Sequence, residues 1–162
     1  LMGLLRHYVS HELDTLHKNG VRLDFIGDWR ALKPDLVRLL EAARERTRAN
    51  TGLRLIMALN YGGQGEIVRA ARALAQEAAA GTLDPDTITP ELLESRLDTA
   101  GLPPPDAVLR TSGELRLSNF LLWQSAYAEY LVTDTLWPDF DGAALERALD
   151  EFARRERRFG GR

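Results

Sequence analysis

The segment RTSGELRLSN, residues 110–119, brings two arginines, a Ser-Gly turn and a further serine close together. Arg110 ends a short apolar stretch typical of a strand, and ligands of open α/β sheets collect beyond the carboxyl ends of strands. Guanidinium forks match phosphate oxygens, so Arg110 and Arg116 could bind an anion, with Ser118 as a donor or as N-cap of an apolar helical segment. The segment could equally be a solvated loop whose arginines pair with Glu114 and nearby acids. Spacing alone leaves both interpretations open.

Other patterns carry reactive residue types, each with a plain structural alternative. The stretch NYGGQGEIV (60–68) could cradle a phosphate, but it lacks the full G-x-G-x-x-G spacing and a Walker lysine, so we favour a tight strand-to-helix turn. His7 and His11 could share a metal, although a solvated helix face is favoured. Glu129, in an apolar approach to a strand, either pairs with an arginine or binds a hard cation such as Mg²⁺. The terminal RRERRFGG is interpreted as a solvated basic tail.

These residues must be positioned by alternating strands and helices, a pattern that favours an α/β layered domain spanning residues 1–162. The apolar run 53–60 is typical of a strand buried on both faces of a mostly parallel central sheet flanked by helices. Trp137 and Phe140 are expected to fill the edge of the core, and Leu145 and Leu149 to share the apolar face of the last helix. Strands are predicted near 21–26, 53–60, 107–110 and 129–134, and helices near 3–19, 33–50, 66–80, from 90, and towards the end of the chain.

Composition narrows the classes of function. The chain has 162 residues and a net charge of −3, which disfavours general binding to nucleic acid. It has no cysteine, which excludes disulfides and thiolate-zinc sites and suits a cytoplasmic protein. No apolar run approaches the roughly 20 residues that span a bilayer. Because residue 1 opens inside an amphipathic pattern with no helix cap before it, we expect the chain to be a fragment.

The long segment DAVLRTSGELRLSNFLLWQSAYAEYLVTDTLWPDF, with NYGG upstream and RRFGG near the end, resembles the isoprenyl (cis-prenyl) transferases. Within that family it is most similar to bacterial undecaprenyl diphosphate synthase. The resemblance extends over essentially all 162 residues but covers only the carboxyl-terminal two-thirds of the family. It implies the α/β fold of undecaprenyl diphosphate synthase, with the amino-terminal part missing.

The resemblance also implies an activity and a set of site residues. Such an enzyme adds isopentenyl diphosphate in cis to an allylic diphosphate, such as farnesyl diphosphate, and makes a polyprenyl diphosphate that serves as a cell-wall lipid carrier. It implies a homodimer in the cytoplasm, with peripheral membrane contact for product release. The resemblance implies that the diphosphate of isopentenyl diphosphate is bound by Arg110, Arg116, Leu117 and Ser118. It implies that Glu129 binds Mg²⁺. It also implies that the partner subunit's active site is reached by Arg158 and Gly160.

Departures from the family pattern limit what this chain can do alone. The amino-terminal Asp-Gly-Asn-Gly-Arg-Trp motif, which carries the catalytic aspartate, is absent, and so is a downstream Asn/Trp/Arg segment. Gln64 stands where arginine is usual, and Tyr130-Leu131 reverses a common order. We therefore expect no catalytic residue in this chain and no activity from it by itself. The alternatives are a non-catalytic partner subunit of a heteromeric cis-prenyltransferase and, on the glycine-rich turn alone, a nucleotide-binding module.

Overall fold

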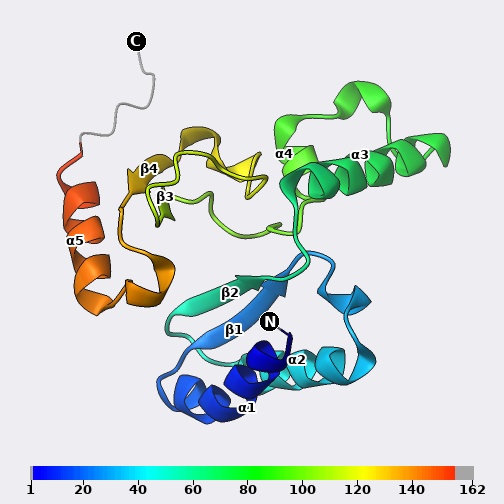
Figure 1. Ribbon diagram of the computed structural model, residues 1–162. Coiled ribbons are helices and arrows are strands. Elements are labelled where there is room, and N and C mark those ends of the chain that lie inside the picture. Colours follow the sequence, from blue (N-terminus) through cyan, green and yellow to red (C-terminus); the bar gives the residue numbers. More distant parts are fainter. Residues whose placement is uncertain (1, 156–162) are drawn as a thin grey trace. The chain divides into compact units, whose positions relative to one another are not determined.

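The strands pair as two parallel two-stranded sheets, each in its own unit of the chain (Figure 1). The computed structural model describes residues 2–155, and the units are residues 1–99 and 100–162. Parallel strands flanked by helices confirm the predicted α/β class, although the strands form two sheets where one central sheet was expected. That residues 1–162 form a single domain stays a prediction.

The first unit begins with α1, β1, α2 and β2. Leu23 and Phe25 of β1 pack with Leu36 and Leu40 of α2 and with Val9 of α1 in one apolar core. Leu40 has no exposed surface, so the centre of this core is dry. The bounds are α1 (Met2–Lys18), β1 (Arg22–Ile26), α2 (Pro34–Thr47), β2 (Arg54–Ala58), α3 (Gly63–Ala79) and α4 (Pro90–Glu94).

Local signals explain these boundaries. Pro34 occupies the first turn of α2, where its missing N–H costs no hydrogen bond. After α1 the chain turns at Gly20, whose φ of 70° lies in the left-handed region that glycine adopts without steric cost. The helix predicted near residues 3–19 is confirmed.

A buried charge fixes β1 to its neighbours. Asp24 is 7% exposed, accepts a 2.7 Å hydrogen bond from Arg54 and forms an ion pair with Arg44 at 2.9 Å. Burial by itself would raise the pKa of the Asp24 carboxyl, but the Arg54 hydrogen bond, the Phe25 N–H and the charges of both arginines together lower it below its ordinary value. Asp24 is therefore a paired structural carboxylate.

The second unit is built on β3 (Ala107–Arg110), β4 (Glu129–Val132) and α5 (Gly142–Ala153). The register pairs Ala107 with Glu129 and Arg110 with Val132. Asp141 caps α5 by accepting a 2.8 Å hydrogen bond from the Ala144 N–H. Residues 111–128 connect the two parallel strands through turns and a short 3-10 helix (Gln124–Tyr127).

Three packing expectations are wrong. Strand β2 is largely exposed or half-buried, because it is an edge strand of a two-stranded sheet rather than an interior strand. Trp137 is 73% exposed and stacks on Phe140, with ring centroids 6.1 Å apart, instead of filling the core. In α5, Leu145 and Leu149 are exposed, since the small Ala144 and Ala148 form its buried side. A helix that approaches a sheet closely does so through its smallest residues.

Candidate functional site

The loop that follows β3 is fastened to the loop that follows β4. The Thr133 N–H donates to the Arg110 carbonyl at 2.9 Å, and the Gly113 N–H donates back to the Thr133 carbonyl at the same distance. The Ser112 N–H donates to the Thr135 carbonyl at 3.0 Å. These bonds extend the strand pairing beyond its carboxyl end and hold Arg110 at the edge where α/β sheets bind ligands.

Arg116, one of the two predicted arginines, pairs with a carboxylate of its own loop. Arg116 forms a two-pronged ion pair with Glu114, at 2.7 Å from Nε and 3.0 Å from Nη2. The Arg116 hydrogen bonds lower the pKa of the Glu114 carboxyl, and the charges of Arg116 and Arg110 lower it further. The pairing with Glu114 that the sequence left open is therefore present. A guanidinium that binds both oxygens of a carboxylate uses the same forked geometry with which it binds two oxygens of a phosphate.

Ser118 does not cap a helix, which corrects one of the two roles considered for it. Its φ is 51°, and Asn119 and Leu121 also have positive φ, at 64° and 45°. Left-handed residues cannot begin a right-handed helix, so the apolar stretch after Ser118 forms turns before its 3-10 helix. The backbone is thus held in a costly shape at Ser118, Asn119 and Leu121, a feature that clusters at ligand-binding loops.

Glu129 lies at the other end of the sheet from Arg110. The register places it beside Ala107, three residues before Val132, which pairs with Arg110. At about 3.3 Å per residue, roughly 10 Å of strand separates the two levels. The structure therefore does not bring the candidate metal ligand together with Arg110.

The oxygen atoms around Glu129 are of the kind that bind a hard cation, but the Arg155 guanidinium already lies among them. The Arg155 Nη1 donates to Glu129 Oε2 at 3.0 Å and to the Tyr130 carbonyl at 2.8 Å, and Nη2 donates to Glu151 Oε1 at 2.6 Å. Carboxylate and carbonyl oxygens are the ligands that Mg²⁺ accepts. Over residues 2–155, however, no three His, Cys, Asp or Glu side chains gather as a metal site. Glu129 could supply one ligand.

The glycine-rich turn after β2 serves packing, as favoured. A Cβ on Gly27 would lie 2.4 Å from the Leu59 carbonyl oxygen, so the loops after β1 and β2 touch. Glu66 in the first turn of α3 is 1% exposed and accepts hydrogen bonds from the Tyr61 hydroxyl at 2.5 Å and the Asp98 N–H at 2.7 Å. A carboxylate of the chain itself thus lies in the turn where a phosphate was considered.

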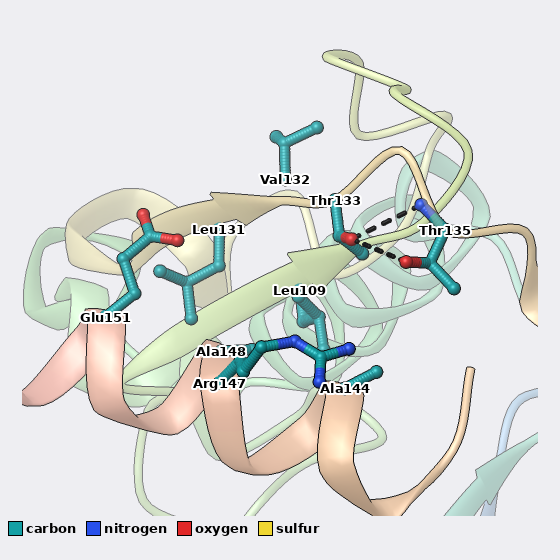
Figure 2. A pocket seen from close by; sticks show the side chains of 9 residues that line it. All are labelled: Leu109, Leu131, Val132, Thr133, Thr135, Ala144, Arg147, Ala148 and Glu151. Carbon is teal, nitrogen blue, oxygen red and sulfur yellow. Dashed lines mark hydrogen bonds between the residues drawn. The ribbon is translucent and has the colours of Figure 1, made fainter.

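A cavity of about 130 Å³ lies between α5 and the β3–β4 pair (Figure 2). Its floor includes Leu109 and Leu131, and Thr133 and Thr135 on its border share a 3.1 Å hydroxyl hydrogen bond. Among residues 2–155, none of the predicted site residues lines it. The remaining lining residues are Val132, Ala144, Arg147, Ala148 and Glu151.

Comparison with known proteins decides the family. Residues 1–160 match the family model described as "Putative undecaprenyl diphosphate synthase". The chain belongs to this family of cis-prenyltransferases. An isoprenyl transferase of Brucella suis is 52% identical over 161 residues, which are 99% of this chain and 63% of that protein. A ditrans,polycis-undecaprenyl-diphosphate synthase specific for (2E,6E)-farnesyl diphosphate, from Xanthomonas axonopodis pv. citri, is 48% identical over 160 residues, 99% of this chain and 62% of that protein.

Solved structures agree with the family assignment. The lavandulyl diphosphate synthase of Lavandula x intermedia, crystallised with dimethylallyl diphosphate, has a TM-score of 0.95 and 35% identity, over 99% of this chain and 70% of that one. A Campylobacter jejuni structure described as a probable undecaprenyl diphosphate synthase has a TM-score of 0.83 and 34% identity, over 98% of this chain and 72% of that one. The chain spans somewhat less than two thirds of the length of the curated relatives named above.

Family membership leaves the individual site roles as predictions. Arg158 and Gly160 lie outside the described residues. His7 and His11 are exposed, with ring centroids 4.0 Å apart and the His11 Nδ1–H donating to the His7 carbonyl at 2.8 Å. Among residues 2–155, none of the helices combines the length and apolar character that crossing a bilayer requires.

Sequence reasoning missed Arg155, which it assigned to a solvated basic tail. A signal was available, because Glu151 and Arg155 stand four apart in the favourable order for a helical ion pair. The contact with Glu129 had no local signal, since 26 positions separate the two residues.

Proposed function

We propose that the protein is an isoprenyl transferase that adds isopentenyl diphosphate units in cis to an allylic diphosphate and makes a polyprenyl diphosphate lipid carrier. Farnesyl diphosphate is the proposed allylic substrate, which is the one named for the Xanthomonas relative. The observation that carries the proposal is the forked pair of Arg116 with Glu114 on the loop that follows β3, the strand that ends at Arg110. Family membership supplies the class of reaction.

In this proposal the diphosphate of isopentenyl diphosphate replaces Glu114 as the partner of Arg116. The guanidinium is 76% exposed, so exchange of its partner requires little desolvation. A diphosphate carries more charge than a carboxylate and can engage Arg110 as well. The Leu117 backbone and the Ser118 hydroxyl would complete the grip, because the left-handed backbone of Ser118 is set before the substrate arrives.

The chemistry requires that the charge developing on the leaving diphosphate be neutralised while water is kept away from an electron-poor allylic carbon. Mg²⁺, when bound, would supply part of that neutralisation, and Glu129 is the residue proposed to hold it. The growing chain favours an apolar channel, because burying the five carbons of one isoprene unit stabilises by about 4 kcal/mol, at ~0.8 kcal/mol per CH₂.

The test compares two similar ion pairs in the full-length protein. Arg116→Ala should raise the KM for isopentenyl diphosphate by about tenfold or more, since a charge-assisted fork is lost, with a much smaller change for farnesyl diphosphate. Arg96 is the matched control, because it makes the same two-pronged pair with Glu77, at 3.0 Å and 2.9 Å, in the first unit. Arg96→Ala should leave both KM values unchanged.

Equal effects of Arg116→Ala on both substrates would contradict the role of Arg116. Failure of the wild-type protein to incorporate labelled isopentenyl diphosphate into a longer prenyl product would contradict the activity itself. Inactivity of the 162-residue chain by itself stays a prediction, and measurable incorporation by that purified chain would contradict it.

A non-catalytic partner subunit remains the alternative. The gene sequence before residue 1 separates the two, since the Asp-Gly-Asn-Gly-Arg-Trp motif would mark an enzyme. Retention of Arg110, Arg116 and Ser118 favours the enzyme, because a partner subunit has less use for a diphosphate grip. The homodimer, the reach of Arg158 and Gly160 into a partner's active site, and a cytoplasmic location with peripheral membrane contact are proposed from the family resemblance.

A further inference from the structure

The guanidinium of Arg155 lies among three oxygens from two elements. It donates hydrogen bonds to the Glu129 carboxylate and the Tyr130 carbonyl at the start of β4. It also donates to the Glu151 carboxylate in the last turn of α5. The side chains of Glu129 and Arg155 are each 33% exposed, so water only partly shields their attraction. Arg155 thereby joins the end of α5 to the beginning of β4.

These oxygens are hard ligands that already surround a positive charge. Carboxylates and carbonyls suit divalent cations such as Mg²⁺ and Mn²⁺. An arginine side chain stays protonated throughout the physiological pH range, so Arg155 keeps its charge. It can leave Glu129 only by moving away, and two cations cannot share one carboxylate without repulsion.

We propose that Arg155 is a positioning residue that acts as the internal counter-cation of Glu129, and that a divalent cation must displace it in order to bind there. The inference rests on the proposed function, from which it takes the assignment of Glu129 as a metal ligand. Metal binding then has two consequences. The cation competes with the ion pair, and the displaced Arg155 releases its hold between β4 and the last turn of α5.

The test is Mn²⁺ affinity, measured by electron paramagnetic resonance on the full-length protein without substrate. Arg155→Met removes the competitor and should tighten Mn²⁺ binding about fivefold, the scale of a half-exposed ion pair. Arg154→Met is the matched control, since it removes the same charge from the neighbouring exposed position, and its affinity should stay close to that of the wild type. Glu129→Gln should weaken binding in the wild-type background.

A structural role alone would predict a different pattern. If Arg155 merely shapes the metal site, Arg155→Met weakens Mn²⁺ binding or leaves it unchanged, and either result overturns the proposal. Equal tightening in Arg154→Met overturns it too, because general electrostatics would then explain the effect. Should Arg155→Met fold poorly, Glu151→Gln removes only the α5 side of the clamp and should tighten Mn²⁺ binding by a smaller factor. No tightening in that variant counts against the proposal.

Amide hydrogen exchange gives a second readout. In the wild type, Mn²⁺ should lower the protection of residues 152–155, because Arg155 is displaced. In Arg155→Met the same amides should exchange faster from the start and should not respond to Mn²⁺. Wild-type protein that elongates a prenyl chain but shows neither effect overturns this inference alone, whereas loss of elongation activity in the wild type contradicts the proposed function instead.

Discussion

The two units of the chain differ in where they place the carboxylates discussed above. In the first unit, Asp24 and Glu66 are buried carboxylates whose partners come from other elements. In the second unit, Glu114 and Arg116 pair with each other on an exposed loop, two positions apart. Backbone shape differs as well. Of the five non-glycine residues with positive φ in the described part of the chain, Asn60 belongs to the first unit and Ser112, Ser118, Asn119 and Leu121 to the second.

This difference separates a scaffold from a binding loop. Buried and mutually satisfied groups rigidify the first unit, because each would lose a partner if the unit opened. The second unit keeps its guanidinium groups near water, where they can exchange partners at little cost, and stores backbone strain in the loop that carries them. The same type of substitution should therefore have unequal effects in the two units.

The largest effect is expected in the apolar core of the first unit. Leu40→Ala should lower the free energy of unfolding by about 2–5 kcal/mol, because Leu40 is fully buried and its removal leaves a cavity. Leu149→Ala in α5 is the control, since Leu149 is 54% exposed, and it should change stability by no more than about 0.5 kcal/mol. Urea denaturation measures both. Comparable losses would mean that Leu149 is covered in solution.

The next largest difference in stability is expected between two glycines, one in close contact with a neighbouring loop and one in open space. Gly27→Ala should cost more than about 2 kcal/mol, because a φ of 91° is unfavourable for alanine and the new Cβ meets the Leu59 carbonyl oxygen. Gly101→Ala shares the left-handed φ, at 77°, but nothing lies within 4 Å of its Cβ position, so only about 1 kcal/mol is expected. Thermal unfolding compares the two. Equal losses would show that the contact between loops adds nothing.

The smallest predicted effect depends on pH. The folded-state pKa of Asp24 is lowered, so the stability it contributes is complete above the unfolded value near 3.8 and is lost as the pH falls through the lower folded value. Asp24→Asn should cost about 1–3 kcal/mol at pH 7, and this difference should shrink below pH 4.

Glu114→Gln is the control for that measurement. The pKa of Glu114 is also lowered, with the Arg116 hydrogen bonds as the main cause, but both side chains face water. The substitution should therefore change the acid side of the stability curve much less than Asp24→Asn does. If the two variants reduced the pH dependence of stability equally, the expected difference between a buried and an exposed carboxylate would be wrong.

Periodicity and turn residues predicted the elements well. Strand β3 was predicted with its observed bounds, Ala107–Arg110, and the short helix α4 begins at the predicted Pro90. Local patterns failed where partners come from afar. The alternation of apolar residues could not show that Ala144 and Ala148, rather than Leu145 and Leu149, form the buried side of α5, because that choice depends on how closely the helix approaches its neighbours.

Residue types at fixed spacing along one segment were enough to predict the family, which the comparisons confirm, and to propose a set of site residues. Tertiary structure decided which of those residues meet. It paired Arg116 with Glu114, and it placed Glu129 at the opposite end of the strands from Arg110. It also gave Glu129 a partner, Arg155, that lies 26 positions away. Strand register and helix packing set such distances, and neither is encoded in the spacing of nearby residues.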